Sequence, residues 1–280
     1  MNSAEYVQRL LSQGWYVMDS LLEGDCLIRV REAVLRQEAL ESREWTSVRQ
    51  QWLTSGHVVP DARTGRAQRV IEAVPEDCGF LADRRLLEVL EAVFGRLARV
   101  SSTGGIVTYP GSRRGHWHAD WPFNQKLATH IRAPYQDAVV HLSAIVMLTD
   151  FTVQNGATLI VPGTHRLSSN PTAEIGVDPH AAYLGEISAT GEAGSVLVYD
   201  SRLWHAAAAN LTDTMRVALT VRYAPWWLNL EVRRAGSPDH ARAILGASGK
   251  DNSVAAIPKV AFDRLPPRVK DLLCHAVADC

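Results

Sequence analysis

Four residues of this 280-residue chain have the types and spacing of a metal centre: His118, Asp120, His205 and Arg216. His118 and Asp120 are two residues apart, so on a strand both side chains point to the same face. His205, from a later strand, completes a set of two imidazoles and one carboxylate, the pattern of non-haem Fe(II) sites. Such a set leaves coordination positions open for a chelating 2-oxo acid and dioxygen. Arg216 is then expected to bind the far carboxylate of that acid.

Other histidines compete for these roles. His116 shares a strand face with His118, and the two could in principle bind a metal together. A carboxylate is the better third ligand, because two neutral imidazoles and one anion leave Fe(II) with one net positive charge that attracts a dianionic acid. We therefore interpret His116 as a structural or supporting residue. His141 and His165 fit the ligand set no better than His205 does.

The remaining charged residues near these segments have simpler interpretations. Arg216 could be a surface or salt-bridging residue, although a bidentate fork to a carboxylate is what arginine provides better than lysine. Asp200 and Asp213 are interpreted as turn residues. Arg113 and Arg114 are expected in a solvated loop, although they could bind an acidic substrate.

The elements that must position these residues begin with helices. Apolar residues recur at helical spacing through the first forty residues, interrupted by a short strand at 14–18. Residues 40–75 are rich in arginine and weakly patterned, which favours a surface excursion over core. A further helix is expected at 82–97.

From about residue 100 to 223 the apolar period changes to two, which is typical of antiparallel strands. Within 139–150 the even-numbered positions from Val140 to Leu148 form an apolar face, and His141 and Ser143 lie on the other. Asn155-Gly156 predicts a hairpin that joins 149–153 to 157–161.

Two further strands are expected at 196–198 and 216–223, and in the second Arg216 shares the more polar face with Ala218, Thr220 and Arg222. Residues 164–190 are expected to form a long loop over the mouth of the barrel, where it could act as a lid. The chain is expected to be a single domain, with N-terminal helices at about 1–97, a barrel at about 100–225 and a C-terminal flank at 226–280 that ends in a helix at 268–278.

The charge composition indicates which classes of binding partner to expect. The 29 basic and 30 acidic residues give a net charge of −1, which does not suggest nucleic acid or an anionic membrane as a partner. We find no signal peptide and no apolar stretch long enough to cross a bilayer, so we expect a cytoplasmic protein that acts on a small molecule. The four cysteines are scattered and are expected to be reduced thiols.

Four segments together resemble the phytanoyl-CoA dioxygenase-like (PhyH) family of Fe(II)- and 2-oxoglutarate-dependent oxygenases. They cover roughly residues 5–225: the glycine-aromatic-valine strand at 14–19, the His118-Ala-Asp120 triplet, the stretch from Asn155-Gly156 to Pro162-Gly-Thr-His165, and the segment from Val198 through His205 and Asn210 to Arg216. Departures are minor, with Gly194-Ser195 and Thr164 in place of the family's usual Gly-Asp and Ser. Neither affects the proposed ligands.

The resemblance implies a mainly β fold with flanking helices, a double-stranded β-helix (jelly-roll, cupin-like) barrel. It implies Fe(II), 2-oxoglutarate and O2 as cofactors, with His118, Asp120 and His205 as catalytic metal ligands and Arg216 as the 2-oxoglutarate-binding residue. The carboxylate of Asp120 favours oxygenation over halogenation, because related halogenases have Gly or Ala at that place.

The expected activity is oxidation of a C–H bond in a small molecule, most simply hydroxylation in natural-product biosynthesis, with decarboxylation of 2-oxoglutarate to succinate and CO2. Desaturation and ring formation are variants of the same chemistry. The alternatives are a non-oxidative cupin-like metal enzyme, an isomerase or hydrolase, and a barrel that only binds a small ligand. The substrate pocket is expected to involve Trp117, residues 121–136, the 164–190 loop and Pro225-Trp226-Trp227.

Overall fold

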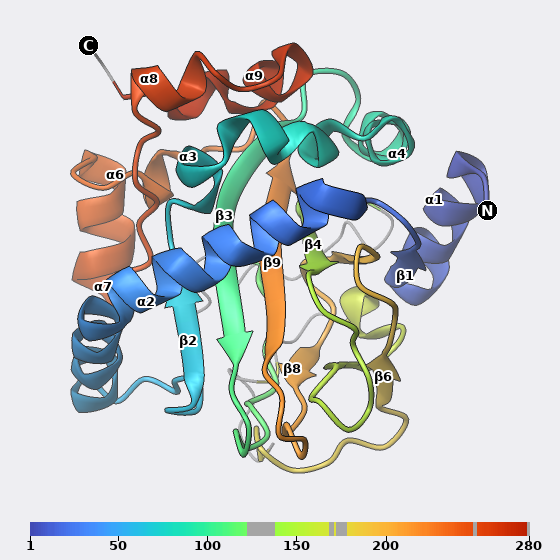
Figure 1. Ribbon diagram of the computed structural model, residues 1–280, viewed down its shortest axis with the longest axis vertical. Coiled ribbons are helices and arrows are strands. Elements are labelled where there is room, and N and C mark those ends of the chain that lie inside the picture. The colour runs from blue at the N-terminus through green and yellow to red at the C-terminus, as the bar shows by residue number, and fades with distance from the viewer. Residues whose placement is uncertain (122–137, 168–170, 172–177, 249–250, 279–280) are drawn as a thin grey trace.

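The computed structural model describes residues 1–121, 138–167, 171, 178–248 and 251–278 (Figure 1). Its α-helices are α1 (Ser3–Gln13), α2 (Gly24–Thr54), α3 (Val70–Ala73), α4 (Arg84–Phe94), α6 (Pro238–His240), α7 (Gly246–Ser248), α8 (Lys259–Phe262) and α9 (Pro267–Leu273). Its strands are β1 (Trp15–Met18), β2 (Thr64–Ala67), β3 (Arg99–Thr108), β4 (Leu142–Met147), β5 (Thr158–Ile160), β6 (Ile187–Ala189), β7 (Val196–Asp200), β8 (His205–Ala207) and β9 (Arg216–Ala224). The 3-10 helices are Pro75–Ala82, Thr164–Arg166, Glu231–Arg233 and Cys274–Ala276, and Ala241–Leu245 is a π-helical turn.

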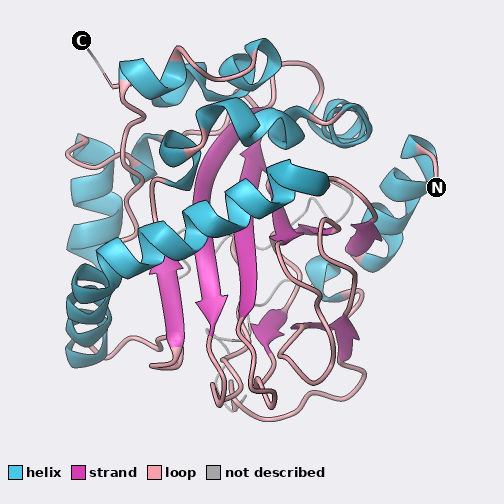
Figure 2. Ribbon diagram, viewed as in Figure 1, coloured by secondary structure: helices cyan, strands magenta, loops and turns pink. Residues whose placement is uncertain are grey.

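The strands form two antiparallel sheets. Six strands pair in the order β1-β7-β4-β9-β3-β2, and three pair in the order β6-β5-β8. The helices gather on one face and at one end of the larger sheet, and α2 crosses that face (Figures 1 and 2). The prediction of a mainly β jelly roll with flanking helices is confirmed.

Alternation along β9 separates the two faces of the larger sheet. Val217, Leu219 and Val221 belong to the apolar cluster that the sheet shares with the helices. Ala218, between them, belongs to a second cluster with residues of β5, β6 and β7, on the face toward the smaller sheet. We call this second side of the larger sheet the inner face. Arg216 and Arg222 lie on it, because they are two and four residues from Ala218.

The cluster under the helices is expected to dominate stability. Leu219 is fully buried in it. A Leu219→Ala variant should lower the free energy of unfolding by roughly 2–5 kcal/mol, through lost burial and the cavity that remains. Urea denaturation measures this, with Leu184→Ala as the control because Leu184 is 96% exposed. Similar losses in both variants would contradict the assignment of the core.

In the N-terminal half of the chain, most of the predicted helices and strands are confirmed and one prediction is wrong. The helix at 82–97 is present as α4, with Asp83 capping its first turn, and the short strand is β1. Residues 40–75 do not form only a surface excursion: α2 continues to Thr54, and β2 pairs with β3 as an edge strand. The long helix is hard to recognise because only four of its residues are buried, and the strand because it is four residues long and contains Gly65.

The Asn155-Gly156 turn is present, but the predicted hairpin is wrong. Gly156 has a φ of +88°, and the Asn155 side chain accepts from the Thr152 amide and donates to the Asp150 carbonyl. The strand that follows, β5, pairs with β6 and β8, while Phe151 bridges to Gly191. Local turn chemistry therefore identified the reversal but not the strand partner, which tertiary packing determines.

The 164–190 segment is only partly a loop, since it contains a helical turn at 164–166 and β6. Residues 168–170 and 172–177, like residues 122–136 of the expected pocket, lie outside the described residues. The lid role stays a prediction. The C-terminal helix is confirmed as α9 and the turn that follows it. None of the described helices has the length and apolarity to cross a membrane, and Cys26, Cys78 and Cys274 are free thiols.

Candidate metal centre

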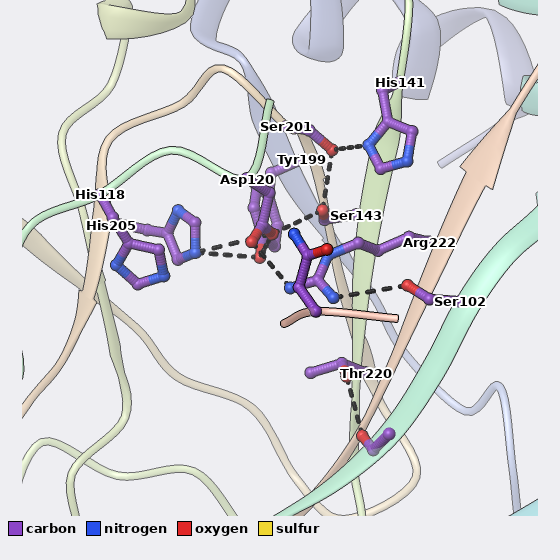
Figure 3. A network of polar contacts seen from close by, with 12 residues as sticks. Ser102, His118, Asp120, His141, Ser143, Tyr199, Ser201, His205, Thr220 and Arg222 are labelled. Carbon is purple, nitrogen blue, oxygen red and sulfur yellow. Dashed lines mark hydrogen bonds and ion pairs between the residues drawn. The ribbon is translucent and has the colours of Figure 1, made fainter. Parts of the chain in front are cut away.

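Two distant segments bring the three proposed ligands together. His118 and His205 pair in an antiparallel bridge, and each backbone amide donates to the other residue's carbonyl at 3.0 Å. Asp120 follows on the same segment, and its amide donates to the Ser201 carbonyl. One ligand atom from each of His118, Asp120 and His205 lies within 4.8 Å of the other two (Figure 3). Backbone pairing thus places all three donors at one point.

Both imidazoles are held in the orientation that metal binding requires. Nδ1 of His118 donates to the His116 carbonyl at 3.0 Å, and Nδ1 of His205 donates to the Leu203 carbonyl at 3.0 Å. A carbonyl only accepts, so each Nδ1 carries the hydrogen and each Nε2 keeps its lone pair. Burial lowers the pKa of both His118 and His205, which keeps both rings neutral.

The Asp120 carboxylate is fixed by three donors. Arg222 donates to Oδ1 at 2.7 Å, and the hydroxyls of Ser143 and Tyr199 donate to Oδ2 at 2.8 and 3.0 Å. Burial raises the pKa of Asp120, but the charge and the hydrogen bond of Arg222 outweigh it and hold that pKa well below its usual range. Asp120 is therefore an anion at neutral pH, with its side chain only 8% exposed.

Behind Asp120 a chain of hydrogen bonds continues into the core. Ser143 shares a hydrogen bond with Ser201 at 2.8 Å, and Ser201 contacts Nδ1 of His141 at 2.7 Å (Figure 3). Nε2 of His141 contacts Ser101 at 2.8 Å. Burial lowers the pKa of His141 to about 3, so the ring is a neutral relay between hydroxyls and not a ligand. The network restrains the carboxylate that faces the metal position.

Removing one hydroxyl of this network tests its role. A Ser143→Ala variant deletes a donor to Asp120 Oδ2, and we expect about a 10- to 100-fold loss of Fe(II) affinity with little change in fold. Metal titration of the apo-protein measures this. Ser12→Ala, on the exposed side of α1, is the control. Equal affinities in the two variants would show that Ser143 does not orient the ligand.

Arg216 lies on the inner face and has no anionic partner among the residues that the structure describes. Its guanidinium donates to the Thr108 hydroxyl at 2.8 Å and lies 4.3 Å from the centre of the Phe151 ring. Its Nε has no hydrogen-bond partner, and no carboxylate of the described residues forms an ion pair with it. Burial lowers the pKa of Arg216 to about 10, so it remains charged at neutral pH. A buried, unpaired guanidinium is costly unless an anion binds to it.

Comparison with known proteins agrees with this chemistry. The family model described as phytanoyl-CoA dioxygenase (PhyH) matches residues 32–218. The chain belongs to this family. It is therefore a dioxygenase that uses Fe(II), 2-oxoglutarate and O2. The donor set fits the metal, because two imidazoles and one carboxylate are ligands that non-haem Fe(II) prefers.

Individual relatives are distant. "Dioxygenase af480" of Aspergillus fumigatus is 28% identical over 194 residues, which is 69% of this chain but only 53% of that protein, so the chain spans about half of its length. HygX from Streptomyces hygroscopicus, solved with nickel and 2-oxoglutarate bound, has a TM-score of 0.60 at 17% identity, covering 84% of this chain and 93% of its own. The α-ketoglutarate-dependent epimerase SnoN from nogalamycin biosynthesis has a TM-score of 0.54 at 18% identity, covering 80% of each chain. At these identities the two structures show a shared fold.

The other residues that the sequence analysis considered near the metal site are not among its three ligands. The His116 ring lies 4.9 Å from that of His118 between centroids, and its carbonyl orients His118, which agrees with a supporting role. His165 is buried and contacts the Leu11 carbonyl. Asp200 was expected in a turn but is the last residue of β7, and its side chain accepts from the amide and the side chain of Arg202 in the turn that follows.

Several expectations about the surroundings need correction. Arg114 is not solvated: it forms a bidentate ion pair with Glu186 and lies 5.0 Å from the Trp117 ring centre. Arg113 is 90% exposed, as expected. Trp117 packs in a separate apolar cluster with Trp204, because it points to the opposite face from its two histidine neighbours. Trp227 is exposed and lines a groove with residues of α1 and α4.

Sequence reasoning missed the residues that hold Asp120. Arg222, Ser143 and Tyr199 come from three neighbouring strands, β9, β4 and β7. Period-two alternation placed Arg222 on the face of Arg216 and Ser143 opposite the apolar face of β4, so a signal for their direction existed. Their convergence on one carboxylate depends on strand order, which the sequence does not state.

Proposed function

We propose that this protein hydroxylates a C–H bond of a small molecule in natural-product biosynthesis. In the balanced reaction, 2-oxoglutarate, O2 and R–H give succinate, CO2 and R–OH. The observation that carries the proposal is the coexistence of a complete two-histidine, one-carboxylate set with the unpaired buried guanidinium of Arg216. The likeness of fold to SnoN, a protein of nogalamycin biosynthesis, supports the natural-product role.

In this proposal His118, Asp120 and His205 hold the iron, which supplies the oxidising chemistry when 2-oxoglutarate and O2 are present. The two backbone carbonyls that accept from Nδ1 keep the imidazoles aimed at the metal. Arg222, Ser143 and Tyr199 keep Asp120 ionised and fixed in direction. The protein thus presents a rigid donor set and requires no proton transfer from these ligands.

Arg216 is proposed to bind the carboxylate of 2-oxoglutarate that is remote from the metal. Its planar fork suits a carboxylate, and the Thr108 hydroxyl and Phe151 ring fix the plane of the guanidinium. Because Arg216 has no carboxylate partner among the described residues, cosubstrate binding would balance a charge that is otherwise buried alone.

Isotope labelling tests the proposed reaction without a known substrate. Enzymes of this chemistry turn over 2-oxoglutarate slowly in the absence of substrate, so wild type incubated with Fe(II), 2-oxoglutarate and ¹⁸O2 should form succinate that carries one labelled oxygen. Formation of succinate without label, or no succinate from folded, iron-loaded protein, would contradict the proposal.

A non-oxidative metal enzyme on the same fold is the runner-up. Such an isomerase or hydrolase has no evident use for a buried guanidinium that pairs with no described carboxylate, so Arg216 favours the oxygenase. One protein of similar fold is an epimerase, so product analysis must show whether the substrate gains a hydroxyl group or is only isomerised.

A further inference from the structure

A second arginine reaches the inner face from the edge of the larger sheet. Arg66 on β2 is paired with Ile106 on β3, and Ile106 is paired with Ala218 on β9. Directly paired residues of antiparallel strands point to the same face. Ala218 and Ile106 belong to the inner cluster, so the Arg66 side chain leaves β2 on the face that carries Arg216 and Arg222.

Arg66 forms no ion pair with a carboxylate of the residues that the structure describes, and it is partly buried. The charge of Asp120 raises the pKa of Arg66, but Asp120 is already paired with Arg222. Its guanidinium lies 5.8 Å from the centre of the Trp45 ring. Burial and the nearby Arg222 lower the pKa of Arg66 to about 10, so it is still protonated at neutral pH. A charged group in this position is stabilised when an anion binds.

Two small residues lie on the inner face of the strands next to Arg66. Gly104 on β3 is paired with Thr220 on β9, and both positions belong to the inner face. A Cβ on Gly104 would make only ordinary van der Waals contacts, at 3.6 Å with the Ala67 carbonyl oxygen and at 3.7 Å with the Thr220 hydroxyl oxygen. The Thr220 hydroxyl donates to the Gly104 carbonyl at 2.8 Å (Figure 3). A glycine within a strand often marks the close approach of a ligand.

Charge balance then favours an acidic substrate. Fe(II), Asp120, 2-oxoglutarate and Arg216 together are neutral. Arg222 and Arg66 add two positive charges on the same face, and the only carboxylate among the described residues that pairs with either is Asp120, which is already counted. A neutral or cationic substrate would leave this charge unbalanced.

We propose that the substrate carries an oxyanionic group, in the simplest case a carboxylate, that binds Arg66 at the β2 edge of the inner face. The oxidised carbon then lies between that anchor and the metal, over Gly104 and Thr220. This inference rests on the proposed function, because it assumes that Arg216 and the metal are occupied by 2-oxoglutarate. Arg66 is thereby a specificity-determining residue.

Selenate is the probe, because it is a small oxyanion whose anomalous scattering identifies it. Crystals of the protein loaded with Ni(II) and 2-oxoglutarate, which do not turn over, are soaked in selenate, and the same complex is titrated in solution by calorimetry. We expect selenate on the Arg66 guanidinium, with an affinity about tenfold or more weaker in Arg66→Gln. Arg66→Lys should recover part of the affinity, and Arg113→Gln, at an exposed arginine, should match wild type.

Two outcomes overturn the inference: no selenate at Arg66 in crystals that hold 2-oxoglutarate, or equal affinity in wild type and Arg66→Gln. Failure of 2-oxoglutarate to bind in the same crystals would instead count against the proposed function. Bound 2-oxoglutarate that contacts Arg66 in place of Arg216 would assign Arg66 to the cosubstrate and would also contradict the inference.

Discussion

Replacing Asp120 with Ala is expected to abolish Fe(II) binding and 2-oxoglutarate turnover together. Removing a residue that only orients a ligand costs about 10- to 100-fold in metal affinity, so removing the anionic ligand itself should cost more than about 100-fold. Metal content after gel filtration and succinate formation measure the two effects. Asp213→Ala is the control, since Asp213 is an exposed turn aspartate.

Stability gives a second, independent result for the same variant. Without Asp120, the Arg222 guanidinium loses its carboxylate in a site where its side chain is 22% exposed. The apo-protein should lose about 3 kcal/mol of unfolding free energy, the lower end of the range for breaking a buried pair. The double variant Asp120→Ala/Arg222→Met should recover part of this loss. Retained iron in Asp120→Ala would contradict its assignment as a ligand.

Replacing Arg216 with Gln is expected to weaken 2-oxoglutarate binding and to leave Fe(II) binding intact. Truncating one partner of a buried charge pair costs about 2–5 kcal/mol, which corresponds to about a 30-fold or larger loss of affinity. Titration of the Fe(II)-loaded protein with 2-oxoglutarate under anaerobic conditions measures it. Arg216→Lys should bind more weakly than wild type, because an ammonium lacks the bidentate fork.

The apo-protein separates this role from a structural one. If Arg216 served in a structural salt bridge, Arg216→Met would lose about 3–5 kcal/mol of unfolding free energy. The structure predicts no such loss, because Arg216 pairs with no described carboxylate and its Nε has no partner. Added 2-oxoglutarate should raise the melting temperature of iron-loaded wild type but not of the variant. A strongly destabilised apo variant would contradict the cosubstrate role.

The sequence predicted the elements that have a strong period. Alternation in β9 was sufficient to place Val217, Leu219 and Val221 in the core and Arg216 on the opposite face, because side chains alternate strictly along a strand. The three proposed ligands were also identified from type and spacing, and the structure brings them within 4.8 Å of one another.

What could not be predicted depends on strand partners. The Asn155-Gly156 turn was recognised. The pairing of β5 with β6 and β8 is non-local, so the turn residues do not predict it. Ser143 and Tyr199 reach Asp120 because β4 and β7 are neighbours in the sheet. Arg66 was missed for the same reason, since β2 is a four-residue edge strand whose face is set by its register with β3.

The assignment of an Fe(II)- and 2-oxoglutarate-binding site is tested by an anaerobic titration of apo-protein with Fe(II) and 2-oxoglutarate, following the visible metal-to-ligand charge-transfer band. We expect a band for wild type, no band for Asp120→Ala, and a band for Arg216→Gln only at much higher 2-oxoglutarate concentration. Absence of a band in folded wild-type protein that retains its iron would rule out the oxygenase site and favour a non-oxidative metal enzyme.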